Sequence, residues 1–96
     1  MSISKFLKRT VIAATMTAAV AAYAQDIKLG FNGDLSASPS AQSGKAGVIG
    51  IEAAIADINA AGGVLGRKLT LVIRDDQSQP PKSIQNMSDL IDNEKV

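Results

Sequence analysis

Hydrophobic positions in residues 25–96 predict a strand, a helix, a second strand and a second helix, in that order. Residues 27–31 alternate apolar with small or polar side chains, as a short strand does. From about Ser43 the period lengthens, and we expect residues 59–63 to end a helix, with a glycine in the left-handed cap. One face of this helix is marked by aliphatic residues three or four positions apart: Val48, Ile51, Ile55 and Ile58.

The second half of this segment repeats the order. Residues 69–73 are almost continuously apolar, which is typical of a parallel strand covered on both faces. Pro80 and Pro81 suit the first turn of a helix, where a missing N–H costs no hydrogen bond, and residues 94–96 resemble the approach to a third strand. We expect the second helix to bury a stripe of four apolar residues: Ile84, Met87, Leu90 and Ile91.

This alternation is the opening of a doubly wound α/β domain with a parallel sheet. Two parallel strands leave both sheet edges open and each helix half covered. A chain of this size buries only about 60% of its unfolded surface. The predicted fold class is therefore α/β, the start (β-α-β-α) of a doubly wound parallel-sheet lobe, and we expect it to be incomplete and unstable alone.

Residues 1–24 have the layout of a secretory signal peptide. Three basic residues stand in the first nine positions, the uncharged residues 10–22 follow, and small residues occupy positions −3 and −1 of a cleavage site after Ala24. The uncharged run of about 13 residues is shorter than the roughly 20 that a membrane span needs. We expect cleavage after Ala24 and, in a double-membrane bacterium, a free periplasmic chain without a cysteine-linked lipid.

Composition excludes several classes of function. The 96 residues include no cysteine and no histidine, which removes disulfides, thiolate metal sites and the commonest general base. The net charge of +1 becomes negative once the basic head of the leader is set aside, so no basic surface for nucleic acid remains. We therefore expect no enzyme activity, no cofactor, no metal and no nucleic-acid partner.

Two glycine patterns do not fit nucleotide sites. Gly44-Lys45 lacks both the upstream glycine and the following hydroxyl residue of a phosphate loop. Residues 62–66 follow a helix and precede a strand, the reverse of a dinucleotide fingerprint. Asp75 and Asp76 are adjacent on a strand end and point to opposite faces, so we expect one to cap the next turn and the other to be solvated.

The loop over residues 33–42 is the candidate binding feature. It has ten residues, whereas strand-to-helix loops commonly have about 2–6, and it follows a parallel strand, where ligands bind in open α/β sheets. Its serines supply hydroxyls, and the N-terminus of the next helix suits an anionic group such as a carboxylate. These features indicate recognition of a small polar ligand, while a solvated loop that contacts nothing is an equally open reading.

Three stretches resemble the periplasmic leucine/isoleucine/valine-binding proteins, which are type I substrate-binding proteins of ABC transporters. They are IKLGF leading into DLS (27–36), ADINAAGGVLGRKL (56–69) and DDQS (75–78) with a proline two residues later. The resemblance covers essentially all of residues 26–96, and the middle stretch is the most specific. It implies that residues 25–96 are the N-terminal part of the first ligand-binding lobe, truncated at Val96, and the signal peptide predicted over residues 1–24 agrees with it independently.

The resemblance also implies a monomer of two lobes that closes over one ligand and docks on an ABC permease in the inner membrane. In relatives, the loop after the first strand lines the cleft, and a side chain at the start of the first helix, often tyrosine, reaches the ligand. The corresponding residue here is Ser43, and Ser36 lies in the loop. A hydroxyl at residue 43 suits a smaller or more polar amino acid, an amide or urea. The alternatives are a type I ligand-sensing lobe of a receptor or signalling protein and, more remotely, a nucleotide-dependent oxidoreductase.

Overall fold

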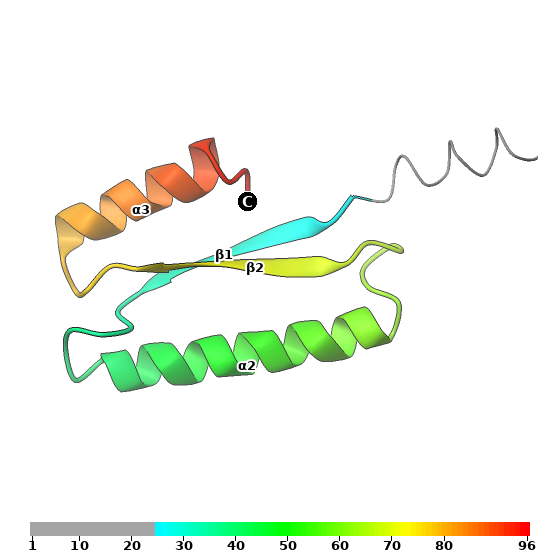
Figure 1. The fold of residues 1–96 in the computed structure, drawn as a ribbon, viewed down its shortest axis with the longest axis horizontal. Coiled ribbons are helices and arrows are strands. Elements are labelled where there is room, and N and C mark those ends of the chain that lie inside the picture. The colour runs from blue at the N-terminus through cyan, green and yellow to red at the C-terminus, as the bar shows by residue number, and fades with distance from the viewer. Residues whose placement is uncertain (1–24) are drawn as a thin grey trace, which may run out of the picture.

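The computed structural model describes residues 25–96, which form a two-stranded parallel sheet between two helices (Figure 1). Helix α2 lies on one face of the sheet and α3 on the other (Figure 1). The predicted order of elements and the parallel pairing are confirmed, and the expected signal peptide, residues 1–24, lies outside the described residues. The elements are β1 (Ile27–Gly33), α2 (Ala41–Ala60), β2 (Leu69–Asp75) and α3 (Pro80–Asp92).

The two strands pair along their whole length, from Ile27 opposite Leu69 to Gly33 opposite Asp75. Both strands continue two residues beyond their predicted ends, because the ladder extends through the polar pair Asn32 and Arg74, which an apolar pattern does not reveal. The end of the sheet formed by Gly33 and Asp75 is called the carboxyl edge below.

The inward face of α2 agrees with the predicted stripe. Val48, Ile51 and Ile55 are half-buried, and Ile58, near the end of the helix, is 37% exposed. The next residue, Asn59, also faces the sheet.

The side chain of Asn59 holds the end of α2 to the start of β2. Its Nδ2 donates to the carbonyl oxygen of Leu69 at 2.9 Å, and its Oδ1 accepts from the Leu69 N–H at 2.8 Å. The paired backbone groups belong to a buried residue, since Leu69 is only 8% exposed. This pair of hydrogen bonds fixes the sheet end opposite the carboxyl edge.

The predicted left-handed glycine cap after α2 is confirmed. Gly62 and Gly63 have φ of +107° and +78°, and their N–H groups donate to the carbonyls of Asn59 and Ile58. A Cβ on Gly63 would lie 2.1 Å from the carbonyl oxygen of Arg67. Both the backbone angle and the lack of space require glycine there.

The predicted apolar stripe of α3 is wrong for three of its four residues. Leu90 is 2% exposed and packs at Gly30, where a side chain would stand 3.4 Å from a Leu90 methyl group. The other three are exposed by between 49% and 71%: Ile84, Met87 and Ile91.

The half of α3 near the carboxyl edge faces the sheet with polar side chains. Asn32 of β1 donates through Nδ2 to the carbonyl of Ser83 at 2.9 Å, and Asn86 donates to the carbonyl of Asp75 at 3.1 Å. The strand ends present polar groups here, so hydrogen-bonding residues of α3 turn toward them and the apolar residues turn away. Periodicity marks the apolar residues of a helix but not which of its sides meets the sheet.

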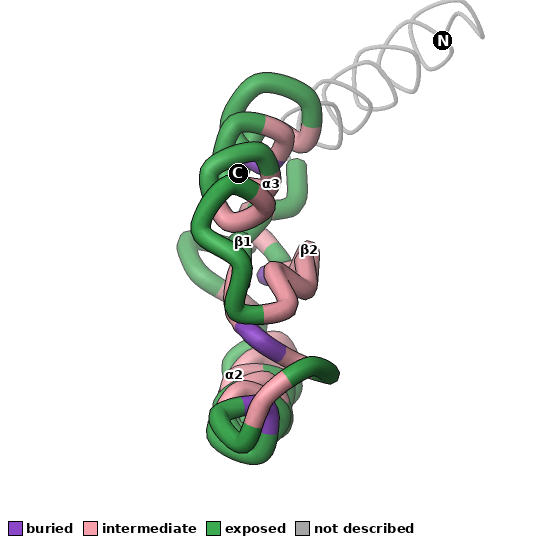
Figure 2. Tube along the Cα trace, turned by 90° about the vertical axis from the view of Figure 1, so that its left-hand side faces the viewer, coloured by how far each residue is buried: buried purple, intermediate pink, exposed green. Residues whose placement is uncertain are grey.

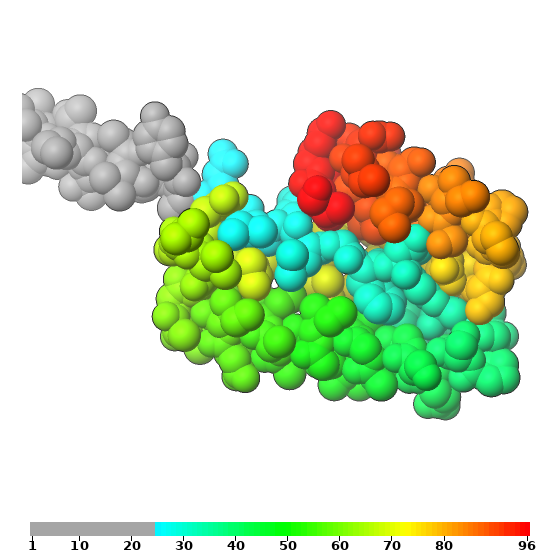
Figure 3. Space-filling model, turned by 180° about the vertical axis from the view of Figure 1, so that it is seen from behind, coloured from blue at the N-terminus to red at the C-terminus, as the bar shows by residue number. Residues whose placement is uncertain are grey.

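Few side chains are fully buried within the described residues (Figure 2). After α3 the chain returns beside β1, where Lys28 Nζ donates to the carbonyl of Glu94 at 3.1 Å, but residues 94–96 form no strand with it. Atoms of β1 are visible at the surface between the two helices in Figure 3. None of the helices in residues 25–96 is long and apolar enough to cross a membrane.

Candidate functional site

Two loops leave the carboxyl edge and meet there. Residues 34–40 connect β1 to α2, and residues 76–79 connect β2 to α3. The first loop is shorter than the predicted 33–42, because β1 and α2 both extend into it. The hydroxyl of Ser78 in the second loop donates to Asp34 of the first at 2.8 Å. These two loops form the candidate site.

Asp34 organises the backbone of the first loop. It is only 9% exposed, although it carries an ionisable side chain. Its Oδ1 accepts the N–H groups of Ser36 at 3.1 Å and Ala37 at 2.9 Å, and its Oδ2 accepts the N–H of Ser38 at 3.0 Å. Three successive backbone donors of the loop therefore point at one carboxylate of the chain itself.

Serine hydroxyls complete the coordination of Asp34. The hydroxyls of Ser38 and Ser40 donate to Oδ2, the latter at 3.2 Å, as does that of Ser78. These hydrogen bonds, chiefly the one from the Ser38 hydroxyl, hold the pKa of Asp34 far below its ordinary value, because they stabilise the charged form. The hydroxyl oxygens of Ser38 and Ser40 also lie 2.6 Å apart, and the Ser38 oxygen accepts the N–H of Ser40, so these serines form one hydrogen-bonded network around the carboxylate.

Asp75, the last residue of β2, likewise accepts hydrogen bonds from backbone N–H groups and a serine hydroxyl. Its Oδ1 accepts the N–H groups of Leu35 and Gln77, both at 3.0 Å, and its Oδ2 accepts the hydroxyl of Ser36 at 2.5 Å. The Ser36 hydroxyl is the main cause of a lowered pKa at Asp75. Asp75 thus joins its own strand end to the loop that follows β1.

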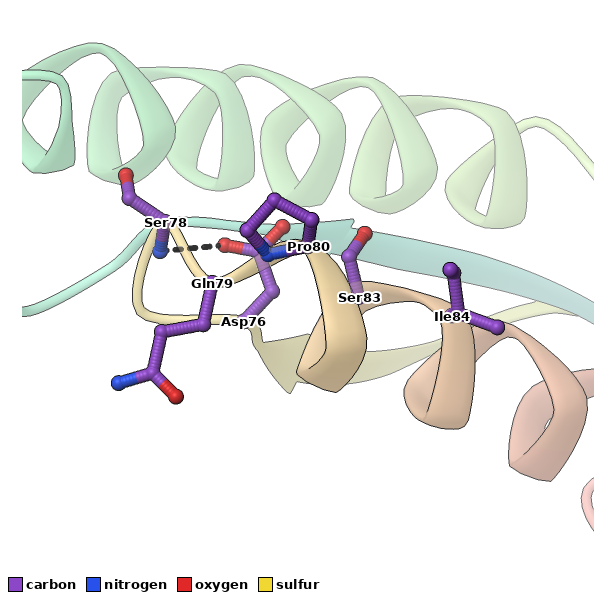
Figure 4. A pocket seen from close by; sticks show the side chains of 6 residues that line it. All are labelled: Asp76, Ser78, Gln79, Pro80, Ser83 and Ile84. Carbon is purple, nitrogen blue, oxygen red and sulfur yellow. Dashed lines mark hydrogen bonds between the residues drawn. The ribbon is translucent and has the colours of Figure 1, made fainter.

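The expectation that either Asp75 or Asp76 is simply solvated is wrong. Asp76 is also half-buried, and its Oδ1 accepts the N–H of Ser78 at 2.9 Å (Figure 4). Both side chains therefore cap turns of the second loop, since an Asp carboxylate readily accepts the N–H two residues on. The sequence predicted that one of these two aspartates caps a turn, but not that both do.

An open cavity of about 470 Å³ lies beside the second loop (Figure 4). Pro80 and Pro81 open α3 without N–H groups, so this helix start offers few donors to an anion. A second cavity, of about 400 Å³, is mainly apolar. The first is lined by Asp76, Ser78, Gln79, Pro80, Ser83 and Ile84, and the second by Leu35, Lys45, Val48, Ile49 and Ile73.

Of the two site residues predicted from the sequence, one lies in the first loop and the other in the helix that follows it. Ser36 is exposed, and its hydroxyl donates to Asp75. Ser43 is exposed in the first turn of α2. Sequence reasoning missed Asp34, although serines at the second, fourth and sixth positions after an aspartate are a pattern that favours turns closed on its side chain.

The polar groups of the site bind one another. Its carboxylates are satisfied by N–H and hydroxyl donors, and the ion pairs recorded for residues 25–96 lie elsewhere, on Lys28 and Arg74. Across the same residues no group of three or more metal-binding side chains occurs. The sequence has no histidine to activate a serine.

Comparison with known proteins identifies relatives of this chain. The profile of the periplasmic binding protein family matches residues 26–96. The chain is 48% identical over 63 residues to a Leu/Ile/Val-binding protein of Citrobacter freundii and 46% identical over 63 residues to a Leu/Ile/Val/Thr-binding protein of Salmonella typhimurium. Each match covers 66% of this chain and 17% of the relative.

A solved structure shares the fold. It is a branched-chain amino acid transporter substrate-binding protein from Streptococcus pneumoniae, in complex with isoleucine. The TM-score is 0.70 at 35% sequence identity, over 74% of this chain and 20% of that protein. The expected architecture, the β-α-β-α start of a doubly wound lobe, is therefore confirmed for the described residues.

Proposed function

The chain belongs to the periplasmic binding protein family, and from that premise we propose that it forms part of the substrate-binding component of an ABC transporter for amino acids or related small amides. The observation that supports this most directly is the pair of loops joined at the carboxyl edge, where open α/β sheets bind ligands. Its role in this proposal is binding, without catalysis.

The proposed ligand is a small neutral amino acid or an amide. The relatives are named for leucine, isoleucine, valine and, in one case, threonine, and the solved relative holds isoleucine. The first loop here is rich in hydroxyls, and Ser36 gives its hydroxyl proton to Asp75, which favours a ligand group that donates a hydrogen bond to the Ser36 oxygen. We propose that Ser36 and Ser43 contact the ligand from this side.

Residues 1–24 are proposed to direct the protein to the periplasm and to be removed after Ala24. Arg67 Nε donates to the carbonyl of Gln25 at 2.7 Å, which holds the start of the described chain at the sheet end opposite the two loops. The mature protein is proposed to act as a monomer and to deliver its ligand to a permease in the inner membrane.

Calorimetric titration of the full gene product tests this function. We expect one ligand per protein, with a dissociation constant in the micromolar range or below, for at least one of leucine, isoleucine, valine, threonine, glutamine, asparagine or urea. NAD and ATP serve as unrelated ligands and should give no heat. Failure of every amino acid and amide in this set would contradict the proposal.

Substitution at residue 43 tests the position of the ligand. Ser43→Tyr restores the aromatic residue common in the resembling family, and we expect it to tighten binding of the aliphatic amino acids relative to the polar ones. Ala54→Tyr adds the same ring at an exposed position farther along α2 and should leave the ratio unchanged. Equal effects of the two substitutions would place the ligand away from the start of α2.

A further inference from the structure

Asp34 contacts both loops of the candidate site, and no ligand contact is needed to explain its environment. We propose that Asp34 is a positioning residue, which holds the loop over residues 34–40 in its ligand-binding shape before a ligand arrives. The proposal rests on the proposed function, because it assumes that this loop contacts the ligand. It assigns a role to a side chain for which the family resemblance implied none.

The first argument is the convergence of backbone donors. Successive N–H groups that point to one centre form a concave anion site in many proteins. Here the N–H groups of Ser36, Ala37 and Ser38 converge on the carboxylate of Asp34, so the anion is part of the loop itself. A loop that is already folded around its own anion loses less conformational entropy when a ligand binds.

The second argument is that the two loops exchange hydrogen bonds. Asp34 of the first loop accepts the hydroxyl of Ser78 from the second at 2.8 Å. Asp75, where β2 enters the second loop, accepts the N–H of Leu35 and the hydroxyl of Ser36 from the first. Because each side supplies both an acceptor and a donor, displacement of one loop breaks contacts at both aspartates. The two loops are therefore held as one unit.

The third argument connects Asp34 to the start of α2. A Cβ on Gly44 would lie 2.0 Å from the carbonyl oxygen of Asp34, so the backbone at Asp34 packs directly against the first turn of the helix. Ser43 is the neighbour of Gly44 in that turn. The Asp34 side chain thus holds Ser36 through its N–H, while the Asp34 backbone packs against the helix turn that carries Ser43.

The test measures ligand affinity and thermal stability together in the full gene product. The ligand is whichever amino acid or amide binds the unaltered protein most tightly. We expect Asp34→Ala to weaken its binding by about tenfold, the equivalent of roughly one lost interaction. Asn59→Ala is the matched control, because it removes two hydrogen bonds at the far end of α2. It should lower stability and leave affinity within about twofold.

Chemical rescue separates positioning from general stability. In Asp34→Ala, sodium formate can occupy the vacated carboxylate position, and we expect it to restore most of the lost affinity. Sodium chloride at equal ionic strength should not, and formate should not improve Asn59→Ala. If Asp34→Ala fails to fold, Ser78→Ala removes a single donor to Asp34 and should weaken binding by a few-fold.

The outcomes are distinguishable. Unaltered binding in a folded Asp34→Ala, or in Ser78→Ala where that variant replaces it, overturns the positioning role while the proposed function stands. Equal losses of affinity in Asp34→Ala and Asn59→Ala, without rescue by formate, also overturn it, since the effect is then one of stability alone. Absence of any ligand for the unaltered protein overturns the proposed function itself.

Discussion

Replacing Gly44 by alanine perturbs the contact that joins α2 to the first loop. The new Cβ would stand 2.0 Å from the carbonyl oxygen of Asp34, where ordinary contacts are 3.4–4 Å. The obstructing atom belongs to the backbone, so a side-chain rotation cannot relieve the overlap. The helix start and the loop must instead move apart, at the expense of the hydrogen bonds at Asp34.

The magnitude follows from two opposing effects. Alanine inside a helix is favoured over glycine by roughly 0.5–1 kcal/mol. Overpacking against a fixed neighbour costs about 1–3 kcal/mol. We therefore expect Gly44→Ala to lower the free energy of unfolding by about 1–2 kcal/mol. Gly50→Ala is the matched control, because a Cβ there meets no atom within 4 Å, and it should raise stability by up to about 1 kcal/mol.

Urea unfolding of the full gene product, followed by circular dichroism, measures both variants. The transition midpoints should move in opposite directions while the slope m stays constant. The difference between the variants isolates the close approach, since the change of residue and the helix are the same. Equal midpoints for Gly44→Ala and Gly50→Ala would refute the close packing of α2 on Asp34.

Three further predictions concern the core, the pH response and the leader. Leu90→Ala should lower the free energy of unfolding by about 2–5 kcal/mol, because Leu90 is 2% exposed, whereas Ile84→Ala, at a residue that is 71% exposed, should change it little. Urea unfolding of both variants checks this, and similar losses would contradict the orientation of α3. The hydrogen bonds that lower the pKa of Asp34 and Asp75 stabilise the fold above the ordinary pKa of 3.8, and this contribution is lost as the pH falls below that value. Asp34→Asn should therefore flatten the fall in melting temperature below about pH 4. An unchanged acid profile would contradict this prediction. The intact mass of the exported protein should correspond to a chain that begins at Gln25, and a mass that retains residues 1–24 would contradict cleavage after Ala24.

Local sequence patterns predicted the elements because each has a direct physical cause. The change from strand to helix periodicity located β1 and α2, and the double glycine located the cap that ends α2, with φ of +107° at Gly62. Element ends were less accurate, since pairing at Asn32 and Arg74 depends on the partner strand.

Features that depend on contacts between distant residues were not predicted. On α3, Asn86 faces the strand end and donates to it, and apolar spacing located only Leu90 on the side that meets the sheet. Asp34 and Ser78 are 44 residues apart, and only the parallel pairing of β1 with β2 brings their loops together. The anion site expected at the N-terminus of α2 stays a prediction, whereas the loop before it binds an internal carboxylate that the sequence did not indicate.

A crystal structure of the full gene product with its tightest-binding ligand is the most direct test of the central claim. The account predicts a small neutral amino acid or amide at the carboxyl edge, within hydrogen-bond distance of the loop over residues 34–40 or of Ser43, with the Asp34 hydrogen bonds unchanged from the ligand-free state. A ligand bound elsewhere, with this loop in contact only with solvent, would contradict the account.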